Sequence, residues 1–368
     1  MLGRLNICSG EAKARHYDHE VKALSVVKPF IGTGDDVPSD STVFLARHGS
    51  TRGFVLSEGV SPFYSDIDTR AMAMSVVDEA VRRQLCAGAD PERIALLDNF
   101  CWPDPVQSET TPDGTYKLAQ LVRACRGLYE ACRAYGTPLI SGKDSMKNES
   151  TMGGVKISVP PTLLVSAIGQ IADVRESVTL EPQQAGDVVF LVGTTRDECG
   201  GGEYYRYVGD RHGAGSPLGQ PRPYVGRNVP TVDTDHTLPL YRAMAEAQSQ
   251  GLLQSATTPT RGGLGPPLAR SVMAAGLGLD LDLGDCADVA ALRPDTVLFS
   301  ESNGRFVVTT RPEDAERFER LFEEGLACRR VGVVIDRPAL RVRSGETPWL
   351  DLDVEKLKPA FKERLGDE

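Results

Sequence analysis

The sequence lacks several motifs that identify common classes of enzyme. No GxGxxG or GxxxxGK[ST] motif occurs, which argues against a dinucleotide-binding fold and against a Walker A phosphate loop. The five histidines show no HxxxH or HExxH spacing, and no GxSxG motif is present. Metalloprotease and serine hydrolase interpretations therefore have no support.

Paired cysteines and long apolar runs are also missing. None of the eight cysteines belongs to a CxxC pair, which favours reduced core thiols over zinc ligands or disulfides. The N-terminal residues contain no apolar signal-peptide core, and no run of about 18 apolar residues occurs. We expect a cytoplasmic protein that is neither secreted nor inserted in a membrane.

Positive charge is scarce. The formal net charge is -10, and no Lys/Arg cluster resembles a stripe that follows nucleic-acid phosphates. We therefore expect no nucleic-acid partner. An anionic ligand has to be bound locally, by helix N-termini, backbone amides, a few cations or Mg²⁺.

The size and composition are those of a globular protein with more than one core. The chain has 368 residues, of which 40% are hydrophobic and 25% charged. Because single cores stop growing near about 250–300 residues, two domains are expected.

The first half alternates apolar strand-like runs with helical patterns. Strands are predicted within residues 43–58, from Arg93 to Asp98, over 138–141 and from Thr162, with helices over 69–87 and about 116–135. This alternation is typical of an α/β or α+β fold.

The second half begins after a change in pattern between about residues 174 and 184. We predict domains over 1–176 and 177–368, the second with a loop-rich stretch over 200–233. Helices are expected from about Leu240 and from Pro312 to Gly325.

The stretch SGKDS, from Ser141 to Ser145, has the chemistry of a ligand site. Together with Asp98 it is expected just past the end of a strand, where ligands bind in open α/β sheets. Gly142 allows close approach to a phosphate, Lys143 offsets negative charge, Asp144 suits Mg²⁺ and Ser145 donates to a substrate oxygen. Five residues alone leave open the alternative of a loop with solvated charges.

Two other features have alternative readings. On the first helix, the pairs Asp78–Arg82 and Glu79–Arg83 have i, i+4 spacing, which fits ordinary exposed ion pairs. The stretch TRGGLG, from Thr260, fits either a helix N-terminus that presents amides to an anion or a tight turn.

Four stretches resemble a known enzyme family. LNICSGEAKARHYDHEV, DEAVRRQLCAGADPERIALLDNFCWPDP, YGTPLISGKDSMKNES and LFSESNGRFVV occur in this order and span most of the chain. They resemble the second half of the synthetase component of phosphoribosylformylglycinamidine synthase, within the aminoimidazole ribonucleotide synthetase-like superfamily. This resemblance implies an N-terminal domain that contributes to a shared barrel-like sheet, followed by a C-terminal α/β domain.

The resemblance also implies a reaction and site residues. ATP would phosphorylate the amide oxygen of formylglycinamide ribonucleotide, and ammonia would displace phosphate to give an amidine. Asp98 and Gly142 match nucleotide-contacting positions of the family, and Ser145 matches a substrate-contacting position. Lys143 stands where many members have a metal-binding asparagine, so either Lys143 contacts phosphate directly or Asp144 takes the metal.

A second, structural nucleotide site of the family is degenerate here. Glu79 matches its glutamate, but Arg83 replaces an asparagine, and in TTPTRGG Thr258 replaces an aspartate and Thr257 a histidine. Thr260, two positions after Thr258, is assigned to the same degenerate site. Since two of three metal ligands are missing, we expect an Arg83–Glu79 ion pair in place of ADP–Mg²⁺.

The family's catalytic histidine and metal-binding carboxylates belong to the first synthetase half, and no stretch resembles the glutaminase. No catalytic residue is therefore assigned here, and the implied partners are that first half and a glutaminase supplying ammonia. A non-catalytic binding or scaffold subunit, or a self-sufficient homodimeric synthetase, are the alternatives.

Overall fold

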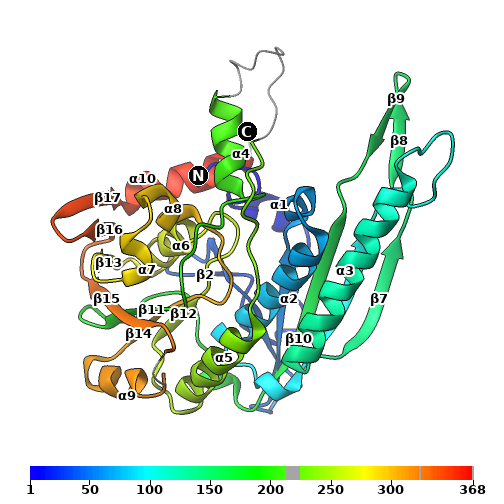
Figure 1. The fold of residues 1–368 in the computed structure, drawn as a ribbon. Coiled ribbons are helices and arrows are strands. Elements are labelled where there is room, and N and C mark those ends of the chain that lie inside the picture. The colour runs from blue at the N-terminus through cyan, green and yellow to red at the C-terminus, as the bar shows by residue number, and fades with distance from the viewer. Residues whose placement is uncertain (213–223, 323–324, 367–368) are drawn as a thin grey trace.

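The computed structural model describes residues 1–212, 224–322 and 325–366. It contains two large sheets (Figure 1). The six-stranded first sheet is open, and its strands follow the order β1-β4-β5-β10-β6-β7. These strands are β1 (Ser25–Val27), β4 (Thr42–Leu45), β5 (Gly53–Val60), β10 (Thr162–Ile171), β6 (Ile94–Cys101) and β7 (Leu139–Ser145). All neighbours are antiparallel except β6 and β7, which are parallel.

The seven-stranded second sheet has the order β12-β14-β11-β15-β13-β16-β17. Its strands are β12 (Ser255–Thr257), β14 (Phe306–Thr310), β11 (Val188–Val192), β15 (Cys328–Ile335), β13 (Gly278–Asp282), β16 (Ala339–Ser344) and β17 (Thr347–Asp353). Two short hairpins complete the strands, β2 (Phe30–Ile31) with β3 (Val37–Pro38) and β8 (Glu149–Met152) with β9 (Val155–Ser158). The β8–β9 hairpin projects beyond the body of the molecule beside α3 (Gly114–Tyr135) (Figure 1).

The helices surround and separate the sheets. They are α1 (Glu11–Ala14), α2 (Thr69–Cys86), α3, α4 (Glu203–His212), α5 (Thr234–Ser249), α6 (Gly265–Ala275), α7 (Ala287–Ala290), α8 (Pro294–Phe299), α9 (Ala315–Glu319) and α10 (Val354–Lys362). The sheets and their helices confirm the α+β class. No helix of the described residues is long and apolar enough to cross a membrane.

Helix α2 is the central helix of the molecule. Its N-cap Asp68 accepts hydrogen bonds from the amides of Arg70 and Ala71 at 2.7 and 3.1 Å. All of its residues are buried except Arg70 and Arg83. We predicted a helix with one apolar face, but α2 is covered by the first sheet, by α3 and by residues of the second half, so nearly every side of it is interior.

The two halves of the chain share their hydrophobic cores. One cluster joins α2, α3, β6 and β10 to β11, β14 and α5, and a second joins β4 and β5 to α6 and the second sheet. Helices α2 and α3 approach closely at Gly127, where a Cβ atom would lie 2.4 Å from the Arg70 carbonyl oxygen. The domain boundary at 176/177 remains a prediction.

Four expected elements differ from the structure. Strand β6 does not end at Asp98 but continues to Cys101, and β7 extends through Ser145. The loop-rich stretch over 200–233 contains α4 among its described residues. The helix expected from Pro312 is a 3₁₀ turn followed by the short α9.

Candidate functional site

The predicted ligand residues lie inside the β6–β7 strand pair and not beyond it. Asp98 pairs with Gly142, and Cys101 pairs with Ser145. The expectation that these residues follow the strand ends is therefore wrong. Strand β7 is an edge strand exposed on both faces, so polar residues are compatible with it. The change from apolar to polar residues after Ile140 is therefore not the end of the strand.

Gly142 allows a carboxylate to lie directly beside the β7 backbone. A Cβ atom at this position would lie 2.7 Å from Asp98 Oδ1, so a larger residue would displace the Asp98 side chain. Burial raises the pKa of Asp98, and the neighbouring negative charge of Asp144 adds to this effect. Asp98, Gly142 and Asp144 thus share one face of the sheet.

That face is the one on which α3 lies, although β7 itself stays exposed. Burial raises the pKa of the Cys125 thiol, and the charges of Asp144 and Asp98 raise it further. Burial also raises the pKa of Cys132 to about 11, and Asp98 contributes to the increase. A pocket of about 550 Å³ lies between α3 and the start of β7, and both cysteines line it together with Leu128, Tyr129 and Leu139. The two carboxylates therefore lie beside a mostly apolar pocket.

Lys143 and Ser145 lie on the opposite face, because successive residues of a strand alternate between faces. The Lys143 ammonium donates a hydrogen bond to Ser145 Oγ. The structure thus brings Asp98, Gly142 and Asp144 together and places Lys143 with Ser145 across the β7 backbone.

Glu149 supports this region and was not singled out from the sequence. Its carboxylate accepts hydrogen bonds from Lys117 Nζ at 3.1 Å and Ser158 Oγ at 2.9 Å, and it pairs with Lys156 Nζ at 2.5 Å. Burial alone would raise the pKa of Glu149, but these bonds outweigh it and lower the pKa to about 2. Glu149 therefore ties the β8–β9 hairpin to α3, and its partner on α3, Lys117, is 32 positions away, too distant in sequence to be recognised by spacing.

The expected ion pair of the degenerate site is present. Arg83 Nη2 lies 2.7 Å from Glu79 Oε1, and their side chains are 16% and 5% exposed. Thr257 donates to Asp40 Oδ2 at 2.5 Å, and Arg270 Nη2 reaches Asp40 Oδ1 at 2.6 Å. Burial opposes ionisation of Asp40, but the charges of Arg270 and Arg83 lower its pKa.

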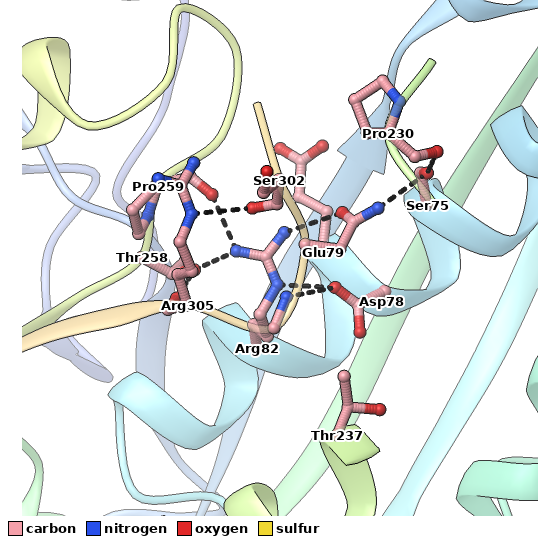
Figure 2. A network of polar contacts seen from close by, with 12 residues as sticks. Ser75, Asp78, Glu79, Arg82, Pro230, Thr237, Thr258, Pro259, Ser302 and Arg305 are labelled. Carbon is pink, nitrogen blue, oxygen red and sulfur yellow. Dashed lines mark hydrogen bonds and ion pairs between the residues drawn. The ribbon is translucent and has the colours of Figure 1, made fainter. Parts of the chain in front are cut away.

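Thr258 contacts Arg82, the neighbour of Arg83 on α2. Its hydroxyl accepts a hydrogen bond from Arg82 and donates to the Arg305 carbonyl at 2.8 Å (Figure 2). Arg82 also donates to the Pro259 carbonyl at 2.7 Å and to Asn303 Oδ1 at 3.2 Å. The turn that would carry a metal-binding aspartate is thus held by a buried guanidinium.

The counter-ion of Arg82 is Asp78, one turn earlier on α2. Arg82 Nε lies 2.6 Å from Asp78 Oδ2, and the two side chains are 2% and 0% exposed, so the expectation of an exposed pair is wrong. Asp78 also accepts hydrogen bonds from the hydroxyls of Tyr135 and Tyr241, the first at 2.6 Å. Burial and then the Asp78 charge raise the pKa of both tyrosines.

The TRGGLG stretch forms a turn that leads into α6. The carbonyl of Thr260 accepts from the Gly263 amide at 2.9 Å, while the Gly262 amide donates to Glu301 Oε1 at 2.7 Å. Glu301 also accepts from the Glu203 amide at 2.8 Å and from the Tyr64 hydroxyl. The anion at this turn is therefore a carboxylate of the chain itself, from the quoted stretch LFSESNGRFVV.

We predict that Arg82→Met destabilises the protein by about 3–5 kcal/mol, because it leaves the Asp78 carboxylate buried without its counter-ion. The matched control is Arg70→Met on the same helix, whose exposed pair with Glu130 contributes at most about 1 kcal/mol. Urea unfolding measures both changes, and equal losses would contradict the role given to Arg82.

Comparison with protein families identifies two adjoining domains. Residues 40–171 match the model described as "AIR synthase related protein, N-terminal domain", and residues 184–345 match its C-terminal counterpart.

Curated relatives carry the name phosphoribosylformylglycinamidine synthase subunit PurL. The protein from Methanocaldococcus jannaschii is 29% identical, and the alignment covers 100% of this chain and 46% of the relative. The protein from Alkaliphilus metalliredigens is 32% identical, with 91% of this chain and 40% of the relative covered. The chain thus spans less than half the length of the relatives it matches.

Solved structures of Thermotoga maritima proteins have a similar fold. PurL complexed with FGAR matches with a TM-score of 0.66 at 19% identity, covering 89% of this chain and 49% of PurL. The PurLQS structure gives 0.67 at 18% identity, covering 100% and 51%. PurL complexed with ATP gives 0.60 at 19% identity, covering 92% and 48%.

Proposed function

The chain belongs to the family of AIR synthase related proteins, and on this premise we propose that it is the second half of an ATP-dependent synthetase that acts on formylglycinamide ribonucleotide in purine biosynthesis. The observation that carries the proposal is the pairing of Asp98 with Gly142 beside Asp144, with Ser145 at the end of the same strand pair. These are the positions at which the family contacts nucleotide and substrate.

The nucleotide is proposed to bind on the α3 side of β7. Gly142 leaves room for the Asp98 carboxylate, and the adjacent pocket of about 550 Å³ has mostly apolar walls. An apolar pocket with a few convergent polar groups is the usual setting for a small-molecule ligand. PurL of T. maritima, whose fold this chain shares, is known in a complex with ATP.

Two carboxylates fit a magnesium ion that accompanies a nucleotide. Asp98 and Asp144 are close enough for the charge of one to raise the pKa of the other, so a cation between them would relieve their repulsion. Mg²⁺ commonly binds through one or two carboxylates together with phosphate oxygens and water. When bound, the ion would neutralise triphosphate charge. No group of three or more His, Cys, Asp or Glu side chains is placed to hold a metal among the described residues, so the other ligands have to come from elsewhere.

The acceptor substrate is proposed to meet the opposite face, where Lys143 contacts Ser145. The Ser145 hydroxyl accepts from Lys143 and keeps its own O–H to donate to a substrate oxygen, and the Lys143 ammonium offsets negative charge there. Because one strand carries both sets of residues, β7 fixes the nucleotide relative to the substrate.

The uncovered face of the first sheet is the proposed contact with the first synthetase half. Leu56, Leu97 and Ile168 are 36–40% exposed on strands β5, β6 and β10. A sheet with helices on one face only leaves apolar side chains to be buried by another domain. The first half covers this face, and a glutaminase supplies ammonia; PurLQS, a structure similar in fold to this chain, contains PurL together with further components.

A homodimer is the second candidate, and the same exposed sheet face favours it, since an isologous contact would bury it against a second copy. Dependence of activity on an added first half separates the two candidates.

We expect the isolated chain not to convert formylglycinamide ribonucleotide with ATP and a high concentration of ammonium, because it lacks the family's catalytic histidine and metal carboxylates. Addition of a first synthetase half from a relative should restore phosphate release. Turnover by the chain alone would instead establish the homodimeric enzyme.

In the reconstituted enzyme, Asp98→Asn and Ser145→Ala are each predicted to lower kcat by about 10²–10³, as removal of a single positioning or charge-stabilising contact does. Glu92→Gln and Ser150→Ala are the matched controls, since both side chains are exposed and lie outside the proposed site. Near-normal rates for Asp98→Asn and Ser145→Ala would remove these residues from the site.

At the degenerate site we expect no ADP–Mg²⁺ to copurify, because the Arg83 guanidinium already satisfies the Glu79 carboxylate. Acid extraction followed by chromatography measures bound nucleotide, and a melting curve with and without a chelator should show the same Tm. About one ADP per chain would show that the ion pair does not replace the metal.

A further inference from the structure

A second pocket lies at the end of the first sheet that is remote from Ser145. The β4–β5 hairpin and the start of β6 flank the end of β10 there, with Gly53 opposite Ile171 and Ile94 opposite Gly169. The pocket has a volume of about 610 Å³. It is lined by Ala46, Arg47, Ser50, Arg52, Gly53, Phe54, Asp90, Arg93, Gln170, Ile171 and Ala172. We refer to it as the basic pocket.

Three guanidinium groups line the basic pocket. Arg47, Arg52 and Arg93 are exposed, and none of their side chains forms a hydrogen bond or an ion pair with any residue that the structure describes. Asp90 supplies the one carboxylate of the lining, and its Oδ1 is engaged as the acceptor of the Glu92 amide at 2.9 Å. The pocket is thus a local excess of positive charge on a protein whose net charge is -10.

The hairpin that carries two of these arginines is held in place by close backbone packing. A Cβ atom on Gly53 would lie 2.3 Å from both the Phe44 carbonyl oxygen and Val174 Cγ1, so only glycine fits. The Val174 amide donates to the Thr51 carbonyl at 2.7 Å, and the Ala46 amide donates to the Arg52 carbonyl at 2.9 Å. The backbone therefore fixes the positions of the arginines at the pocket.

The remaining walls combine apolar and uncharged polar groups. Phe54, which is 38% exposed, offers apolar surface, and the Gln170 carboxamide and the Ser50 hydroxyl add hydrogen-bonding groups. Guanidinium groups bind phosphate oxygens through paired N–H donors, which several arginines together provide to a doubly charged anion.

We propose that the basic pocket binds a small phosphate monoester, with the phosphate held by Arg47, Arg52 and Arg93 and the organic group against Phe54. The site is separate from the proposed nucleotide site. Arg93 lies immediately before β6 and precedes Asp98 by five residues, a distance of roughly 17 Å at about 3.3 Å per residue. The proposal does not depend on the proposed synthetase function.

The test is a titration of the full chain with phenyl phosphate, in which isothermal titration calorimetry at constant ionic strength measures the Kd. We expect saturable binding, and we expect the triple variant R47Q/R52Q/R93Q to weaken it at least tenfold. The control triple variant R126Q/R227Q/R320Q removes the same charge from exposed positions outside the pocket and should change the Kd less than twofold.

Two results would overturn the proposal. One is the absence of saturable binding up to about 10 mM ligand, which is weaker than the affinity of a built site. The other is an equal loss of affinity in both triple variants, which would show that the anion responds only to overall charge. Circular dichroism spectra of both variants establish that the chain is folded in each titration.

Discussion

The buried ion pair of Asp78 and Arg82 is the interaction on which the arrangement of the two halves depends. Both side chains lie on α2, in the interior between the first sheet and the second half of the chain. Removing two charges from water is costly, and the cost is offset only when the remaining hydrogen bonds of each group are satisfied. Asp78 finds them on α3 and α5, and Arg82 finds them on the turn after β12 and at Asn303. One pair therefore sets the relative positions of four segments.

The sequence was informative where short-range patterns decide the structure. The periodicity of α2 and α3 predicted both helices, and the i, i+4 spacing predicted the Glu79–Arg83 contact. The i, i+4 spacing predicts that two side chains meet but not whether other segments bury them, so the burial of Asp78 and Arg82 was not predicted. Their partners are separated from them by about 50 to more than 200 positions, and no local pattern records such contacts.

The predicted ends of strands β6 and β7 were wrong for a related reason. Alternation and apolar content locate a strand when one of its faces is buried, but β7 is exposed on both sides and carries polar residues without penalty. The family resemblance singled out Asp98 and Gly142, and the parallel register then showed that a larger residue at position 142 would displace the Asp98 carboxylate. The basic pocket left no signal in the sequence, because its three arginines are brought together by strands β5, β10 and β6.

The position of β7 at the sheet edge has a consequence for the order in which the site forms. Its backbone is held by β6 alone, and its outer edge has no strand partner within the described residues. Edge strands with few buried contacts open locally at a lower free energy than the core, and their amides exchange with solvent sooner. Asp144 and Ser145 thus lie on a segment that frays before α2 does. Whatever docks along this edge also completes the local folding of the strand, so part of its binding free energy is spent on ordering the residues that it meets.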